Sequence, residues 1–177
     1  LAIAVVRSHG VTARAAVVEE ISADPSRAGL ELGELLGPAP DGPTATFVWY
    51  DPLTGVNISA LLDGLARGGY PAVFGGGAGQ PFGPRIRTFQ YCGDRVLSNS
   101  AVALAIHGLE AVYDMTHGTE PTGLELTVTR SRDNVIEQID DQPALDVCCE
   151  QLGFEGIDRQ SSNWALGIKP PDGTAYE

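Results

Sequence analysis

The pattern of apolar and polar positions in the first half of the chain predicts strands and helices in alternation. Val, Ile and Ala dominate residues 1–6 and 12–21, and residues 44–50 are β-branched and aromatic, which is typical of β-strands. A short apolar segment at 71–74 is interpreted as a further strand. Glycine- and proline-containing turns separate these segments, so each is expected to end where its apolar run ends.

Two segments carry apolar residues at helical spacing and have capping residues at their ends. Residues 25–36 follow Asp24 and precede Gly37, and residues 58–67 follow Asn57 and precede Gly68. We expect an amphipathic helix in each. The second helix lies between two predicted strands, which indicates a parallel strand–helix–strand crossover.

The second half of the chain has a different pattern. Residues 75–84 are dominated by glycine and proline, and we expect a long irregular loop there. Apolar runs broken by turn residues then follow, which predicts an antiparallel meander. Its strands are expected at 85–92, 95–106, 109–116, 123–129 and 134–139. The run from Ser100 to Ile106 is apolar on both faces, as a central strand would be.

A last helix is expected at 143–152, where the apolar stripe contains Leu145, Cys148, Cys149 and Leu152. Both adjacent cysteines are therefore expected in the core. Taken together, the elements predict an α/β (α+β) fold with a mixed, largely antiparallel sheet and flanking helices. Trp164 to Ile168 is the last segment that is strand-like in sequence.

Composition excludes several functions. The 177 residues are 43% hydrophobic and 19% charged, which is typical of one globular core and not of a disordered chain. The net charge of −12 makes nucleic acid and anionic membranes poor partners. No apolar run reaches the roughly 20 residues of a bilayer span. Three cysteines without a paired spacing favour a reducing cytoplasm.

The glycine-rich segment does not fit a nucleotide site, because Gln80 stands where a third glycine would be needed and Pro81 interrupts any following helix. Arg85 and Arg87 are two residues apart on a predicted strand and point the same way. They could offer a fork to a carboxylate or phosphate, or they could pair with surface acids. The sequence leaves both interpretations open.

His9, His107 and His117 each stand in a turn-like setting, and none has the spacing of a zinc site. An axial haem ligand needs no such spacing, so His107 and His117 stay open as haem ligands. No nucleophile motif occurs, which leaves only an enzyme of unrecognised type as an alternative. Asp140 and Asp141 are interpreted as caps of the last helix.

Several segments resemble the FIST sensory domain. They are Pro71–Ala78, Arg87–Gln90, Ala101–Leu104, Thr116–Gly123 and, most closely, Thr127–Arg130, Asn134–Ile136 and Ile139–Leu145. The last of these is similar to a motif in which Asp-Gly-x-Pro-Ala begins a helix, although Asp141 replaces the glycine. The likeness covers residues 1–168 and belongs to the N-terminal FIST segment. Residues 169–177 are then expected to begin a linker to a C-terminal segment.

The resemblance implies a cytoplasmic input domain, not an enzyme, that binds a small molecule, an amino acid or a derivative, and signals to a fused or partner output module. Some FIST proteins bind haem and respond to nitric oxide, so a haem-based gas sensor is the alternative. The resemblance transfers no catalytic residue. Because the chain begins at Leu1 without Met, we expect a fragment whose apolar edges are exposed or covered in a homodimer.

The candidate ligand site lies in the two long glycine-rich loops, 75–84 and 117–123, which we expect to converge. Backbone N–H groups near Gly76 and Gly77, together with Arg87, are expected to hold a carboxylate. His117 and Thr119 are expected to contact the amino or side-chain end of a free amino acid. No metal site is expected.

Overall fold

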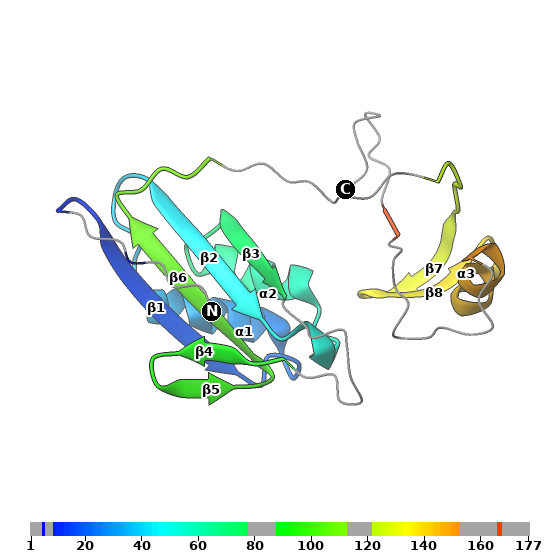
Figure 1. Ribbon diagram of the computed structural model, residues 1–177, viewed down its shortest axis with the longest axis horizontal. Helices are drawn as coiled ribbons and strands as arrows, with labels where there is room; N and C mark the ends of the chain where they lie inside the picture. The colour runs from blue at the N-terminus through cyan, green and yellow to red at the C-terminus, as the bar shows by residue number, and fades with distance from the viewer. Residues whose placement is uncertain (1–4, 6–8, 78–87, 113–121, 153–165, 168–177) are drawn as a thin grey trace. The chain divides into compact units, whose positions relative to one another are not determined.

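The computed structural model describes residues 5, 9–77, 88–112, 122–152 and 166–167 (Figure 1). The chain divides into two compact units, Leu1–Tyr113 and Asp114–Glu177. Each unit is described by itself. The fold combines helices with mostly antiparallel sheets, which confirms the predicted α+β class. No described helix is long and apolar enough to cross a membrane.

A four-stranded sheet forms the centre of the first unit, in the order β1 (Thr12–Glu19), β6 (Ser100–His107), β2 (Thr44–Tyr50) and β3 (Val73–Gly77) (Figure 1). Strand β6 pairs antiparallel with both β1 and β2, while β3 is parallel to β2. The parallel pairing of β2 with β3, on either side of a helix, confirms the predicted crossover. The central position predicted for the 100–106 run is also confirmed.

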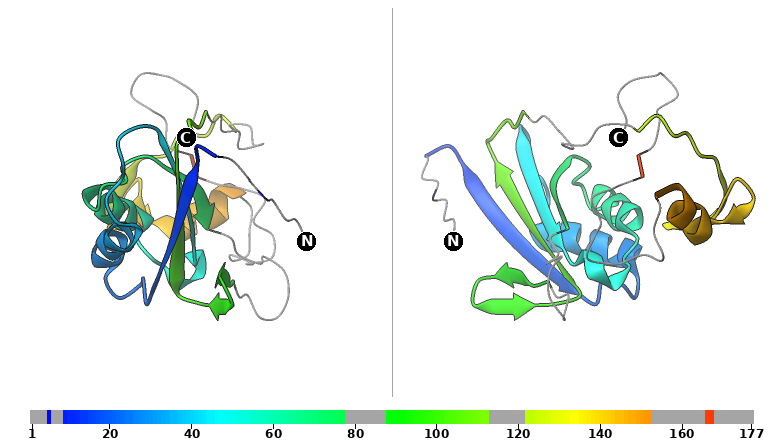
Figure 2. Two further views of the ribbon diagram at one scale, coloured as in Figure 1. Left: turned by 90° about the vertical axis from the view of Figure 1, so that its left-hand side faces the viewer. Right: turned by 45° about the vertical axis from the view of Figure 1, so that its right-hand side comes forward.

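Helices α1 (Pro25–Leu36) and α2 (Ile58–Arg67) cover one face of this sheet, as the edge-on view in Figure 2 shows. Both have the predicted limits because their caps are formed. The Asp24 side chain accepts a hydrogen bond from the Arg27 backbone N–H at 3.0 Å, and the Asn57 side chain accepts one from that of Ala60 at 3.2 Å.

The two helices pack closely because glycines meet at their interface. A Cβ atom on Gly29 would lie 1.9 Å from the backbone oxygen of Leu61, and one on Gly64 would lie 2.1 Å from that of Ser26. The helices can therefore approach nearer than any side chain would permit. Between them and the sheet lies a core of fully buried residues, which includes Leu32, Leu36, Leu61 and Leu65.

Strand β3 corrects the prediction that the irregular loop begins at Gly75. Residues 75–77 continue the strand and pair in register with β2. Gly75 has φ +125° and approaches β2 so closely that a Cβ atom would lie 2.1 Å from the oxygen of Val48. Glycine weakens an isolated strand, but here the missing side chain is what lets the backbones come together.

The predicted meander is largely wrong. In the described part of its first two strands, a short hairpin forms from β4 (Gln90–Cys92) and β5 (Arg95–Leu97), and the predicted strand 95–106 is divided between β5 and β6. Residues 85–87 lie outside the described residues. Strand β6 does not pair with β5, its neighbour in sequence, but lies between β1 and β2. Residues 109–112 are not a strand despite their alternation. The rest of that predicted strand lies outside the described residues, as does the predicted strand 1–6 apart from residue 5.

In the second unit, β7 (Val128–Arg132), β8 (Val135–Ile139) and the two-residue β9 (Gln142–Pro143) form a three-stranded sheet beside α3 (Ala144–Leu152). Strand β7 begins later than predicted, because residues 122–127 are irregular. The core consists of Ile139, Val147 and Cys148, with Leu126 and Ala144 packed against it. Strand β8 and the position of α3 agree with the sequence.

Three expectations for this unit need correction. Asp140 and Asp141 form the turn between β8 and β9, with φ +48° and +61°, instead of capping α3. The Asp140 carboxylate accepts a hydrogen bond from the Thr127 N–H at 3.1 Å. Leu145 is exposed, so the buried stripe of α3 is narrower than predicted. Cys148 is buried as expected, while Cys149 is half-buried.

Candidate ligand site

The face of the four-stranded sheet that α1 and α2 leave uncovered carries a row of aromatic rings. Phe47 and Trp49 alternate with the core residue Val48 along β2, and Phe74 pairs in register with Phe47 on β3. The ring centroids of Phe47 and Trp49 are 6.0 Å apart with an interplanar angle of 13°, and those of Phe47 and Phe74 are 5.7 Å apart. Trp49 is 43% exposed although it belongs to a central strand.

The hairpin of β4 and β5 is attached to the sheet by buried polar contacts. Ser100 Oγ on β6 donates a hydrogen bond to Gln90 Oε1 at 2.9 Å, and Gln90 Nε2 donates a long one to Thr88 Oγ1 at 3.5 Å. All three side chains are buried. Both bonds satisfy groups that would otherwise be costly to bury, and the bond from Ser100 joins β4 to β6. An exposed ion pair between Arg95 and Glu19 also links β5 to β1.

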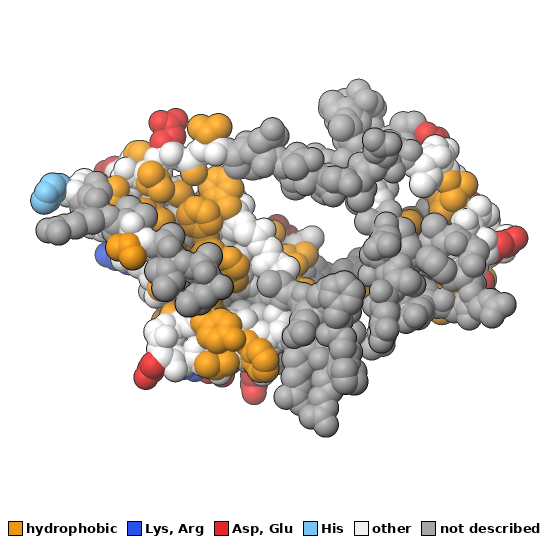
Figure 3. Space-filling view, in the orientation of Figure 1, with side chains coloured by type: hydrophobic (Ala, Val, Ile, Leu, Met, Phe, Trp, Pro, Cys, Tyr) orange, Lys and Arg blue, Asp and Glu red, His pale blue; other side chains and the backbone are white. Residues whose placement is uncertain are grey.

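A pocket of about 340 Å³ lies between this hairpin and the aromatic end of β2. Its lining consists of Trp49, Tyr50, Phe89, Gln90, Tyr91 and Val102. None of these described lining residues carries a charge, and four of the six are aromatic. Figure 3 shows hydrophobic side chains gathered over this part of the sheet and the hairpin. The volume lies in the roughly 300–1,000 Å³ range of small-molecule sites.

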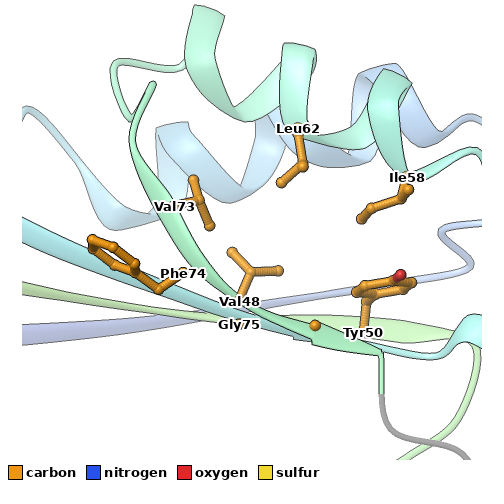
Figure 4. Close-up of a pocket in the computed structure, with 8 residues that line it drawn as sticks. Val48, Tyr50, Ile58, Leu62, Val73, Phe74 and Gly75 are labelled. Carbon is orange, nitrogen blue, oxygen red and sulfur yellow. The ribbon is translucent and has the colours of Figure 1, made fainter. Parts of the chain in front are cut away.

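A second cavity, of about 130 Å³, lies between α2 and the strands β2 and β3 (Figure 4). Ile58 and Leu62 of α2 point toward Val48 and Tyr50 of β2, and Gly75 and Gly76 border the cavity. Its volume is below the range of ordinary ligand sites. It is therefore a gap in an apolar layer, and the hairpin pocket is the better candidate.

The residues predicted from the sequence are placed only in part. Gly76 and Gly77 lie on the edge strand β3, both exposed, and not in an irregular loop. Gly76 borders the smaller cavity, whereas Gly77 packs beside Pro52. Arg87, His117 and Thr119 lie outside the described residues, so the convergence of the two loops stays a prediction.

The pocket joins residues that the sequence does not mark as a common site. Phe47 and Trp49 carried a usable signal, since they alternate with residues of the helix-covered face and so had to share the other face. Phe89 and Tyr91 have the same two-residue spacing. The pocket brings Phe89 and Tyr91 together with Trp49, and no pattern within either segment indicates that placement.

The surroundings of His107 do not favour the alternative in which this residue is a haem ligand. It is the last residue of β6 and is buried, not set in an exposed turn. Its Nδ1 lies 3.0 Å from Thr44 Oγ1, and its Nε2 is buried without a hydrogen-bond partner among the described residues. An iron could reach Nε2 only if the surrounding side chains moved apart. His117, the other candidate, lies outside the described residues.

The geometry thus defines an α+β domain with a largely aromatic pocket beside the uncovered face of its main sheet. The family model described as "FIST N domain" matches residues 1–142, and the chain therefore belongs to this family. The FIST domain is a sensory domain of signal transduction. Searches of curated proteins and of solved structures found no match for the chain.

Proposed function

We propose that this chain is the ligand-binding input part of a cytoplasmic sensory protein and that its ligand is an amino acid or a close derivative. Membership of a sensory family supports the general role. The three cysteines are free, which agrees with a reducing compartment. The observation that carries the proposal is the 340 Å³ aromatic pocket, which is large enough for a molecule of this size.

The described lining residues offer apolar contact area but no charged side chain. The carboxylate and amino group of an amino acid would therefore have to bind to other residues. Arg87 remains our candidate for the carboxylate, and His117 and Thr119 for the amino or side-chain end. Backbone N–H groups near Gly76 and Gly77 belong to the same hypothesis. Arg87 precedes Phe89 by two residues and Tyr91 by four, so the chain can bring its guanidinium within reach of the pocket.

Signal output requires a partner, and we propose a fused or separate output module. The hairpin is the element best suited to transmit occupancy, because one of its strands lines the pocket and its other strand pairs only with the first among the described residues. A homodimer is a further expectation, since exposed apolar side chains such as Val96 favour association.

Isothermal calorimetry with a panel of L-amino acids tests the proposal. We expect a subset to bind, and we expect Arg87→Ala to weaken binding by roughly 10- to 150-fold, the equivalent of about 1.5–3 kcal/mol for a charge-assisted hydrogen bond. Arg27→Ala is the matched control, because Arg27 lies at the start of α1 and its described bond uses only the backbone. Unchanged affinity in Arg87→Ala would remove Arg87 from the site, and no binding across the panel would overturn the ligand class.

A further inference from the structure

We infer that the hairpin pocket recognises one flat, uncharged aromatic ring, so that the ligand of the sensor carries such a ring. The inference deepens the proposed function and rests on it for the identity of the pocket as the sensory site. It concerns which part of a ligand the described residues can hold.

The first wall of the pocket is a prearranged aromatic surface. Trp49 is held by its nearly parallel neighbour Phe47, and β2 is bonded on both sides, to β6 and to β3. Val102 on β6 completes this wall and is buried. A ring that stacks on Trp49 meets a surface that is already fixed, so little conformational entropy is lost on binding.

A second part of the lining comes from the hairpin and the residue that precedes it. Phe89 and Tyr91 line the pocket and are 45% and 67% exposed, which is unusual for large aromatic side chains. A ring inserted between Trp49 and Tyr91 would remove apolar surface of both from water. Aromatic pairs add a stacking preference to this burial.

The described lining residues favour a ligand ring without charge, because none of them is charged. Among the described lining residues only Gln90 has a side-chain amide, and its bonds to Ser100 and Thr88 hold it in place. A carboxamide can take part in about four hydrogen bonds, so Gln90 can also meet one N–H or O–H of a ring. A charged ring substituent would lose hydration without gaining a counter-ion among the described lining residues.

The volume agrees with one ring and its substituents. An apolar cavity of about 150 Å³ accommodates benzene. The 340 Å³ of this pocket therefore leaves room for a bicyclic ring or for a single ring with a short chain. Indole and phenol are the probes that represent these shapes without the charged ends of an amino acid.

The test locates binding at Trp49. The sequence has two tryptophans, so in a Trp164→Phe background the side-chain N–H signal of Trp49 is the only indole signal of the protein in a proton–nitrogen NMR spectrum. We expect indole, phenol and L-tryptophan to shift this signal, and L-leucine to leave it unchanged. Calorimetry on the same samples gives the affinities.

Substitutions on the hairpin provide the control. Tyr91→Ala is expected to weaken indole binding roughly tenfold, and Tyr91→Phe to retain it because the ring is kept. Val96→Ala is matched to these variants, since Val96 pairs with Tyr91 across the hairpin but does not line the pocket. It should bind indole as the unmodified protein does.

The outcomes separate this inference from the proposed function. If amino acids without rings bind while the Trp49 signal stays fixed, the aromatic-ring inference is overturned and the proposed function stands. If indole shifts the signal but no amino acid binds, the ring site stands and the proposed ligand class is overturned. If indole, phenol and the aromatic amino acids all leave the signal unchanged, the ring inference is overturned.

Discussion

The two faces of the main sheet are built from the same strands and differ in what covers them. On one face, Leu32, Leu61 and Leu65 of the helices are fully buried against the strands. On the other face, Trp49 keeps 43% of its surface exposed, next to a hairpin of two three-residue strands. Because side chains alternate along each strand, one face of the sheet forms the core with the helices. The other face leaves large aromatic side chains partly exposed.

This difference has a thermodynamic consequence. Burial of a large aliphatic side chain contributes about 1.5–3 kcal/mol relative to leaving it exposed. The helix-covered face collects many such contributions. The exposed aromatic residues of the other face, such as Tyr91, can therefore be exchanged with smaller effects on folding than the buried leucines.

The largest effect is expected when the helix-covered face is damaged. Leu32→Ala removes a fully buried side chain from the middle of α1 and should lower the free energy of unfolding by about 2–5 kcal/mol. Urea denaturation followed by circular dichroism measures the change. Leu35→Ala on the same helix is the control, because Leu35 is 56% exposed and should change stability far less. Equal losses in both variants would contradict the division between the two faces.

A smaller effect, dependent on pH, is expected at Tyr70. Its hydroxyl donates a hydrogen bond to the Gly37 oxygen at 2.8 Å, at the end of α1. Burial raises the pKa of Tyr70 above its ordinary value of 10.0, and the Arg14 charge opposes this rise. Tyr70→Phe should therefore cost about 1 kcal/mol at neutral pH, the value of one hydrogen bond.

The sign of the pH dependence follows from that pKa. Below the ordinary tyrosine pKa of about 10, the hydroxyl is protonated in the folded and unfolded chain, and its contribution is complete. Above it, the unfolded chain ionises first, so the contribution of Tyr70 to stability falls as the pH rises. Denaturation between neutral and alkaline pH should show a steeper loss in the unmodified protein than in Tyr70→Phe, and parallel losses would contradict the assignment.

The smallest effect on folding is expected on the aromatic face. Tyr91→Ala should change the free energy of unfolding by less than about 0.5 kcal/mol, as is usual for exposed side chains. The same urea titration applies, and a loss comparable to that of Leu32→Ala would show that the hairpin supports the core. A negligible change, combined with weaker indole binding, would sharpen the contrast between the faces.

The sequence was most informative where structure is set locally. The limits of α1 and α2 could be predicted because Asp24 and Asn57 cap them through bonds to residues three positions later. Strand β2 followed from its β-branched and aromatic content. In each case the decisive contacts lie within one turn or one strand.

The predictions from sequence are wrong or incomplete where contacts between distant segments determine the structure. The glycines of β3 are typical of a loop in sequence. They form a strand because Gly75 pairs closely with Val48 of β2, a contact that the sequence does not indicate. The residues of β6 indicate a central strand, but nothing within them indicates that its neighbours are β1 and β2. The pocket was missed for the same reason, since it joins Trp49 to Tyr91 across unrelated elements.

The position of β6 also determines the order in which the molecule can assemble. Strands β1 and β2 do not pair with each other in the described sheet. Each pairs with β6, which comes much later in the chain. While the protein is being synthesised, the helices can pair and β2 can join β3, but β1 has no neighbour until Ser100–His107 emerges. Such long-range closure slows folding and leaves open strand edges during translation. Chains that terminate before Ser100 should therefore be prone to aggregate and dependent on chaperones.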